Sequence, residues 1–159
     1  MTTDTAALIA SLQDEDARIR FARFEHDDAL AVGARIIELA RERGQTISTA
    51  IWLGEQQVYH AALAGTTADN DGWMRRKAAT TRRYDASSQL VRTRWNEYGV
   101  TAATEALGVE PLVYAFAGGA VPIRIGATQV GVVVASGVSD EVEHALVVEV
   151  LEEHLAAQQ

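Results

Sequence analysis

The chain has 159 residues, of which 48% are hydrophobic and 23% charged. This is the composition of one globular domain, and it excludes a disordered protein. The net charge of −8 argues against a general nucleic-acid binder, and the absence of cysteine excludes disulfide scaffolds, thiolate metal sites and cysteine nucleophiles. Residues 1–14 lack the basic start of a secretory signal, and no apolar run approaches the ~18 residues of a membrane helix, so we expect a cytoplasmic protein.

Hydrophobic periodicity and turn residues predict short helices and strands along the chain. In the N-terminal half these are a helix over 4–15, a strand over 19–24, a helix from Asp27 or Asp28 to Arg43 closed by Gly44, and a hairpin of 46–53 and 57–63. In the C-terminal half the first elements are a helix over 72–84 capped from within 69–71, a helix from 87 or 88 to 99, and a helical turn over 102–107. Strands over 112–116, 121–125 and 129–135 follow, and the last element is a helix capped by Ser139. Pro122 places its strand at a sheet edge or marks the start of that strand.

The order of these elements predicts an α+β fold. Tight turns between strands favour antiparallel pairing, and the βαβ alternation of a Rossmann-type sheet is missing. We expect an antiparallel sheet of five strands flanked by helices in an α/β/α arrangement, of the profilin, PAS or GAF kind. Residues 1–159 are expected to form one domain, in which residues 1–17 make an N-terminal helical extension.

Basic residues are concentrated between residues 75 and 94. This segment holds seven basic residues and one acid, a charge of +6, so the total of −8 leaves −14 for the rest of the chain. At 100° per residue, four arginines fall on one side of the predicted helix, and Trp73, Lys77 and Tyr84 fall on the other. Such a segment either binds an anionic ligand or an acidic partner, or forms a solvated or subunit-contact face.

Lys77 is the only lysine among 14 basic residues, and it ends the motif Gly65-Thr66-x-x-Asp69-Asn70-x-x-Trp73-x-x-Arg76-Lys77. A lysine among aromatic residues is a ligand contact or a reactive amine, although coding bias also produces a lone lysine. Backbone amides over 65–70 would suit an anion at a helix start, and the same residues also read as a loop followed by a helix cap.

The four histidines show no metal-ligand spacing, so no metal site is predicted. His144 and His60 are candidates for a haem ligand, or are packed and hydrogen-bonded histidines without such a role. No nucleophile elbow, phosphate loop or dinucleotide fingerprint is present. Catalytic residues therefore stay unknown, and we expect the chain not to be an enzyme on its own.

In these motifs the sequence resembles the haem-degrading-domain family of HbpS/GlcG-like proteins, and within it the uncharacterised branch of bacteria, fungi and plants. The resemblance spans about residues 20–155 and rests on Phe21-x-x-Phe24, Asp28-Ala29, the Gly65–Lys77 motif, Ser87-Ser88, Gly118-Gly119-x-x-Pro122-Ile123, Val134-x-Ser136-Gly137 and Glu143-His144-x-Leu146-Val147-Val148.

The resemblance implies a profilin-like fold, homo-oligomers built from dimers, and haem or another anionic small molecule as ligand. Some relatives bind haem or take part in its breakdown, and one branch interacts with a protein-targeting chaperone system. The ligand-binding residues that it implies are Gly65, Thr66, Asp69, Asn70, Trp73, Arg76, Lys77, Ser87, Gly118, Gly119, Ser136 and Gly137. Ala117 and Glu143 stand where family members often carry His and Asp, and the change at Ala117 removes one candidate ligand.

Three functions follow from these observations. The first is a haem-binding or haem-degrading-type protein, in which arginines hold the propionates and His144 or His60 is the ligand. The second is a non-catalytic oligomeric interaction or assembly protein, a partner in a chaperone network. The third is a small-molecule sensor, which rests on analogy with PAS- and GAF-like sheets.

Overall fold

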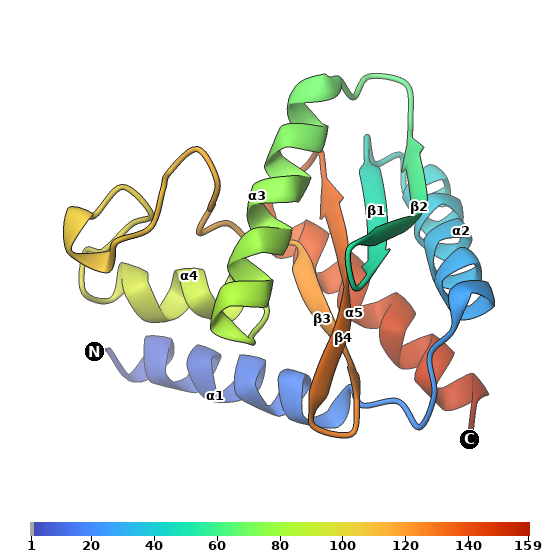
Figure 1. Ribbon diagram of the computed structural model, residues 1–159, viewed down its shortest axis with the longest axis horizontal. Helices are drawn as coiled ribbons and strands as arrows, with labels where there is room; N and C mark the ends of the chain where they lie inside the picture. The colour runs from blue at the N-terminus through green and yellow to red at the C-terminus, as the bar shows by residue number, and fades with distance from the viewer. Residues whose placement is uncertain (1) are drawn as a thin grey trace.

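The computed structural model describes residues 2–159 and has the α+β architecture that the order of elements predicts (Figure 1). The elements are α1 (Thr3–Arg18), α2 (His26–Glu42), β1 (Ser48–Leu53), β2 (Gln56–Ala62), α3 (Ala68–Tyr84), α4 (Ser88–Asn96), the 3-10 helix η1 (Glu105–Leu107), β3 (Ala120–Ile125), β4 (Thr128–Ser136) and α5 (Asp140–Ala157). The strands form one sheet in the order β2-β1-β4-β3, and every neighbouring pair is antiparallel.

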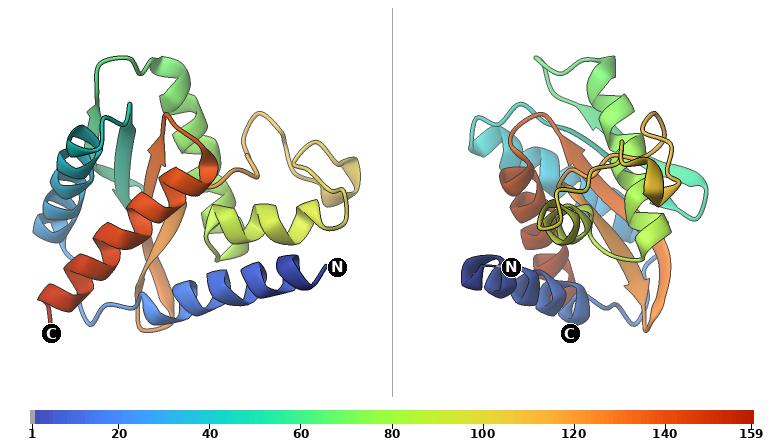
Figure 2. Two further views of the ribbon diagram at one scale, coloured as in Figure 1. Left: turned by 180° about the vertical axis from the view of Figure 1, so that it is seen from behind. Right: turned by 90° about the vertical axis from the view of Figure 1, so that its left-hand side faces the viewer.

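Helices cover both faces of this sheet. Side chains alternate between the two faces along each strand, and the strands place apolar residues on both, so each face needs a covering layer. Ile51 and Val133 point to the face that α2 and α5 cover, within the larger hydrophobic cluster. Ala50 and Val134 point to the opposite face, where they pack with Met74 of α3. Figure 2 shows the sheet between α3 on one side and α2 with α5 on the other. The expected α/β/α layering is therefore confirmed.

The sheet has four strands, so the prediction of five is wrong. Residues 112–116 form a turn and irregular chain, because the Ala115 backbone hydrogen-bonds to Thr80 and Arg76 of α3 instead of to a strand, and Leu112 is left 84% exposed. Phe21 lies beside the outer edge of β3 through an isolated parallel bridge with Ile125. This bridge is all that forms of the predicted strand over 19–24. Pro122 lies in β3, which is an edge strand as predicted.

Two helices start earlier than predicted, because the residue that caps each one lies further upstream. The Thr67 side chain accepts a hydrogen bond from the Asp69 amide, and the Asn70 side chain accepts one from the Thr67 amide. This capping box starts α3 at Ala68, four residues before the predicted start. Glu25 is likewise the N-cap of α2, with Asp28 completing its capping box.

The remaining predicted boundaries differ by a few residues. Gly44 follows the C-cap of α2 with a φ of 64°, as its predicted role requires. Ser139 is the N-cap of α5, but its side chain makes no capping hydrogen bond. The N-terminal helix α1 packs through Leu12 against Leu90 and Val91 of α4, in a cluster of its own. No helix within residues 2–159 is long and apolar enough to cross a membrane.

Candidate functional site

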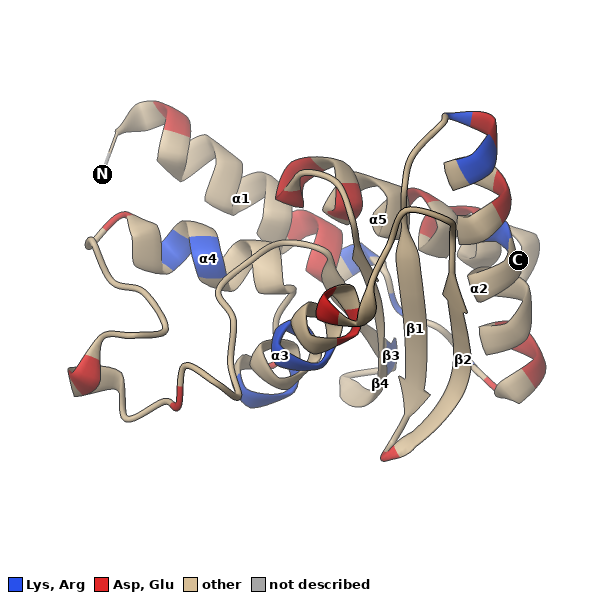
Figure 3. Ribbon diagram, turned by 90° about the horizontal axis from the view of Figure 1, so that it is seen from above, with Lys and Arg blue, Asp and Glu red and all other residues tan. Residues whose placement is uncertain are grey.

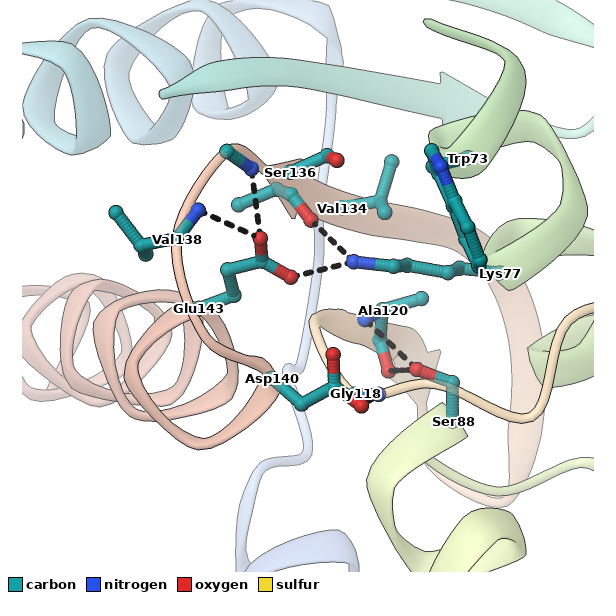
Figure 4. A network of polar contacts seen from close by, with 12 residues as sticks. Trp73, Lys77, Ser88, Gly118, Ala120, Val134, Ser136, Val138, Asp140 and Glu143 are labelled. Atoms are coloured by element: carbon teal, nitrogen blue, oxygen red, sulfur yellow. Dashed lines mark hydrogen bonds and ion pairs between the residues drawn. The ribbon is translucent and has the colours of Figure 1, made fainter. Parts of the chain in front are cut away.

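The feature that organises the site is a buried ion pair between Lys77 of α3 and Glu143 of α5 (Figure 4). The two side chains are 3% and 2% exposed, and the lysine Nζ donates both to Glu143 Oε2 and to the Ala135 carbonyl oxygen, at 3.3 Å. Isolated charges at this depth are costly, so each partner depends on the other. The Lys77 Nζ is thus occupied by Glu143 and the Ala135 carbonyl oxygen, an arrangement that does not suit a nucleophilic amine.

Backbone amides complete the surroundings of Glu143. Its Oε1 accepts hydrogen bonds from the amides of Gly137, at 2.6 Å, and Val138, at 3.0 Å. Burial raises the pKa of the Glu143 carboxyl above its ordinary value, while Lys77 and these two amides act in the opposite direction. Both carboxylate oxygens are engaged, so the pair fixes the end of β4 to α3 and α5.

Gly118 and Gly119 let the backbone approach this pair closely. A Cβ at Gly119 would lie 2.7 Å from the Ala135 carbonyl oxygen and 3.0 Å from Glu143 Oε2, and its φ of +113° suits only glycine. The Gly118 amide donates to Asp140 Oδ2 at 3.0 Å, and a Cβ there would lie 2.8 Å from the Asp140 carbonyl oxygen. The Gly-Gly element therefore belongs to the site for steric reasons.

A polar pocket of about 260 Å³ lies beside the ion pair. It is lined by Asp69, Asn70, Trp73, Lys77, Ser136, Gly137, Val138, Asp140 and Glu143. The side-chain amide Nδ2 of Asn70 donates to Ser136 Oγ at 3.3 Å, and the Trp73 indole donates to Asp69 Oδ2 at 3.2 Å. The pocket thus joins the start of α3, the end of β4 and the first turn of α5. Six of the twelve residues singled out in the sequence line it.

Four other predicted residues lie outside this pocket. Thr66 Oγ1 donates to the Leu63 carbonyl oxygen in a tight turn in which Gly65 has a φ of +98°. Ser87 caps α4 by accepting from the Leu90 amide, so its role is structural. The Arg76 guanidinium lies 4.1 Å from the centroid of the Trp73 ring and does not line the pocket. The backbone over 65–70 forms this turn and the capping box of α3.

Both candidate haem ligands bind carboxylates. His144 is 6% exposed, its Nε2 lies 2.7 Å from Glu15 Oε2, and its Nδ1 is buried without a hydrogen-bond partner within residues 2–159. His60 Nε2 lies 2.8 Å from Asp71 Oδ1, beside a pocket of about 160 Å³. Neither histidine lines the motif pocket, and no group of three His, Asp or Glu in the described chain is placed to hold a metal ion.

The basic segment 75–94 is partly neutralised within the chain. Besides Lys77, Arg92 pairs with Asp140 at 3.0 Å and Glu141 at 2.9 Å. Three arginines lie over aromatic rings, with Arg76 on Trp73, Arg82 on Trp52 and Arg83 on Tyr114. Figure 3 shows the basic positions along α3 and α4 and the acidic positions on α1 and α5.

The sequence reasoning missed Glu143 and Asp140 as site residues, although a signal for Glu143 is present. Glu143 precedes Leu146 and Val147 by three and four residues, and it therefore lies on the buried stripe of α5. Lys77 follows Met74 by three residues on the buried stripe of α3. One positive charge on the buried face of α3 and one negative charge on the buried face of α5 indicate an ion pair between these helices.

The fold and site define a three-layer α+β protein whose polar motifs meet at a buried ion pair beside a small pocket. A model of the HbpS-like family, described as "Haem degrading protein HbpS-like", matches residues 24–152. The chain belongs to this family. It is 41% identical to a UPF0303 protein of Streptomyces coelicolor over 152 residues, which cover 95% of this chain and 96% of that protein.

Solved structures share this fold. The crystal structure of the Ybr137w protein superposes with a TM-score of 0.85 at 25% identity, covering 94% of this chain and 88% of that one. A PduOC complex with haem has a TM-score of 0.65 at 14% identity, covering 86% of this chain and 95% of that one. At 14% identity, the likeness to the haem complex shows the fold alone. Distant structural relatives of this chain thus include a protein solved with haem.

Proposed function

We propose that the protein is a small-molecule-binding protein whose ligand enters the pocket beside Lys77 and Glu143. The observation that carries this proposal is the convergence of motif residues from α3, β4 and α5 on one pocket of about 260 Å³. A volume just below the usual 300–1,000 Å³ of ligand sites suits a molecule smaller than most drugs. The pair at its base supplies rigidity, since both partners are held by further hydrogen bonds.

The rim of the pocket is richer in acceptors than in free donors. Asp69 and Asp140 each engage Oδ2 within the protein, Asp69 with Trp73 and Asp140 with Arg92 and the Gly118 amide, and each keeps Oδ1 as an acceptor, whereas the charge of Lys77 is balanced by Glu143. The Trp73 side chain, 37% exposed, adds an aromatic surface. A ligand that donates hydrogen bonds, such as an amine or a polyhydroxyl compound, matches this arrangement better than an anion does.

Haem, which the family resemblance favours, does not fit the residues as they are arranged. His144 presents no ring nitrogen to a pocket, and the space beside His60 is about 160 Å³, well below the usual size of a ligand site. The motif pocket offers no unpaired cation for a propionate. We therefore assign no step to haem in this chain.

The proposal is tested by ¹⁹F NMR on protein labelled with 5-fluorotryptophan, with the Trp73 signal assigned from Trp73→Phe. Small amines, polyols and carboxylic acids are titrated separately. We expect saturable shifts of the Trp73 signal with the first two classes, weakened in Asp69→Asn but retained in Asp71→Asn. Asp71 is the matched control, because it lies in the same helix turn and binds His60 outside the pocket. Shifts with carboxylic acids alone, or with none of the three classes, contradict the proposal.

A haemin titration separates this proposal from the haem hypothesis. The haem hypothesis predicts a saturable, shifted Soret band that weakens in His144→Ala. We expect no such His144-dependent band, since Nε2 of this histidine is engaged by Glu15. A saturable band that is lost in His144→Ala would show that the His144–Glu15 contact opens to admit haem. This result would overturn our assignment.

A second function, self-assembly into homo-oligomers built from dimers, is favoured by the segment 97–117. This segment extends away from the sheet (Figure 1), and its side chains Tyr98, Leu112 and Val113 are 74%, 84% and 47% exposed. Large apolar side chains exposed on one projecting segment are typical of an interaction site. Light scattering after size exclusion tests it: Leu112→Ser should lower the mass, whereas Leu8→Ser on α1 should not. A wild-type monomer at micromolar concentration contradicts it.

A further inference from the structure

A second pocket, of about 290 Å³, lies between α1, α4 and the β3–β4 turn, apart from the motif pocket. Its lining includes three arginines, Arg20, Arg94 and Arg124, which come from three different parts of the chain. The carboxylates that line it are Asp16 and Asp85. Guanidinium groups therefore outnumber carboxylates in a space of molecular size.

The three arginines differ in what holds them. Arg20 donates from Nε to the Ala17 carbonyl oxygen at 2.9 Å and from Nη1 to that of Gly126 at 2.7 Å. These partners are neutral, so they orient the guanidinium and leave its charge uncompensated. The side chain of Arg94, a half-buried residue, makes no hydrogen bond or ion pair within residues 2–159. Both arginines therefore have binding capacity left for a ligand.

Arg124 forms the inner wall of this pocket. Its side chain is 5% exposed, and its Nη2 donates to the carbonyl oxygen of Asp85 at 2.5 Å and to its Oδ1 at 3.0 Å. These contacts accompany the left-handed conformation of Asp85, whose φ of 48° makes it the one non-glycine residue with positive φ in the described chain. The Asp85 side chain is 61% exposed, and it is shared with Gln129, so it compensates the buried guanidinium only in part.

Asp16 adds little compensation. Its Oδ2 accepts a hydrogen bond from the Ser87 amide at 3.0 Å, and it makes no ion pair with a described residue. Burial raises the pKa of this carboxyl above its ordinary value, against the opposing effect of the Ser87 amide and of Arg124. The pocket therefore carries a net positive charge that protein carboxylates do not neutralise.

We propose that Arg20, Arg94 and Arg124 form a binding site for a small oxyanion, a phosphate group in the first place. Guanidinium forks match the oxygen geometry of phosphate and carboxylate, and their charge-assisted hydrogen bonds are the stronger kind. Three guanidinium groups that line one pocket can together engage several oxygens of a tetrahedral group. The site is independent of the motif pocket, and Gln13, Asp16 and Ala17 bring α1 into it.

Isothermal titration with inorganic phosphate at constant ionic strength tests this site, and acetate serves as the carboxylate probe. We expect saturable phosphate binding that is weakened at least about tenfold in Arg94→Gln, since a charged hydrogen bond contributes roughly 1.5–3 kcal/mol. Arg23→Gln is the matched control, because it removes the same charge from an exposed residue that does not line the pocket. Weaker binding of acetate supports a phosphate site, and equal binding supports an oxyanion site of broader range.

Amide chemical shifts in ¹⁵N-labelled protein give a second readout. Phosphate should move the signals of Ala86 and Ala127, which line the pocket, and should leave those of Gly137 and Val138 in place. No saturable change up to about 10 mM phosphate, a concentration that detects even millimolar affinity, would overturn the proposal. Equal binding by Arg94→Gln and Arg23→Gln would overturn it as well.

Discussion

The two pockets treat charge in opposite ways. At the motif pocket, Lys77 and Glu143 are almost fully buried and satisfy each other together with three backbone groups. At the arginine pocket, the guanidinium groups of Arg20 and Arg124 are oriented largely by carbonyl oxygens, and Arg94 has no protein partner within the described residues. A closed pair holds the fold together, whereas an oriented and uncompensated charge remains available to a ligand. Whether a buried charge is available to a ligand therefore depends on its protein partners, and burial alone does not decide it.

The pockets also differ in where they lie in the chain. The motif pocket is built wholly from residues 69–143, inside the stretch 24–152 that the HbpS-like family model matches. The arginine pocket takes four of its lining residues from positions 13–20, upstream of that stretch. The fold therefore supports one site within the family region and another that depends on α1.

The largest expected effect comes from breaking the closed pair. Lys77→Met leaves Glu143 buried without its cation, and we expect the free energy of unfolding to fall by about 3–5 kcal/mol. Urea denaturation followed by circular dichroism measures it. In Lys77→Met/Glu143→Gln no charge remains and the side-chain amide oxygen can still accept from the Gly137 and Val138 amides, so most of the loss should be recovered. Arg75→Met, on the exposed side of α3, should change stability by less than about 0.5 kcal/mol. A loss below this level for Lys77→Met would mean that the pair is not buried.

The next effect tests the close approach of the Gly-Gly element to that pair. Gly119→Ala puts a Cβ 2.7 Å from the Ala135 carbonyl oxygen at a φ of +113°, and we expect a loss of roughly 1–3 kcal/mol. Gly72→Ala in α3 meets no atom within 4 Å, so it should stabilise the helix by about 0.5–1 kcal/mol. Opposite signs in thermal melts are the expected outcome, and equal shifts would argue against the steric role of Gly119.

A smaller effect is expected at the cap that starts α3 and positions Asp69 and Asn70. Thr67→Ala removes the side-chain oxygen that accepts from the Asp69 amide, which should cost about 1 kcal/mol. Ser139→Ala at the start of α5 is the matched control, because that side chain makes no capping hydrogen bond. If the two variants lose equal stability in urea titrations, the capping box does not account for the position of α3.

The smallest effect concerns the Glu15–His144 contact, which ties α1 to α5. The hydrogen bond from His144 lowers the pKa of the Glu15 carboxyl below its ordinary value. A lowered carboxyl pKa stabilises the fold above the ordinary value of 4.5, and this contribution is lost as the pH falls through the folded-state pKa. The contribution is less than about 1 kcal/mol. Glu15→Gln should therefore show a flatter decline of stability below about pH 4.5 than the wild type or Asp14→Asn. Identical acid profiles would contradict this coupling.

Local patterns predicted most of the elements, and their errors have local causes. The hairpin β1–β2, the helix α2 and the strands β3 and β4 follow from periodicity and turn residues. The predicted strand over 112–116 does not form because the Ala115 backbone hydrogen-bonds to Thr80 and Arg76 of α3, a long-range contact that no local pattern reports. For the site, the sequence motifs identified Lys77, Trp73 and Ser136, but they did not identify Glu143, the partner of Lys77.

The sequence by itself determined the α+β class, the concentration of positive charge in residues 75–94 and the importance of the motif around Lys77. Only the tertiary structure decided that Lys77 faces Glu143, 66 residues away, and that Arg20, Arg94 and Arg124 meet in one pocket. The physical reason is that periodicity depends on neighbours three or four residues apart. The pairing of charges depends on how helices from different parts of the chain cross the two faces of the sheet.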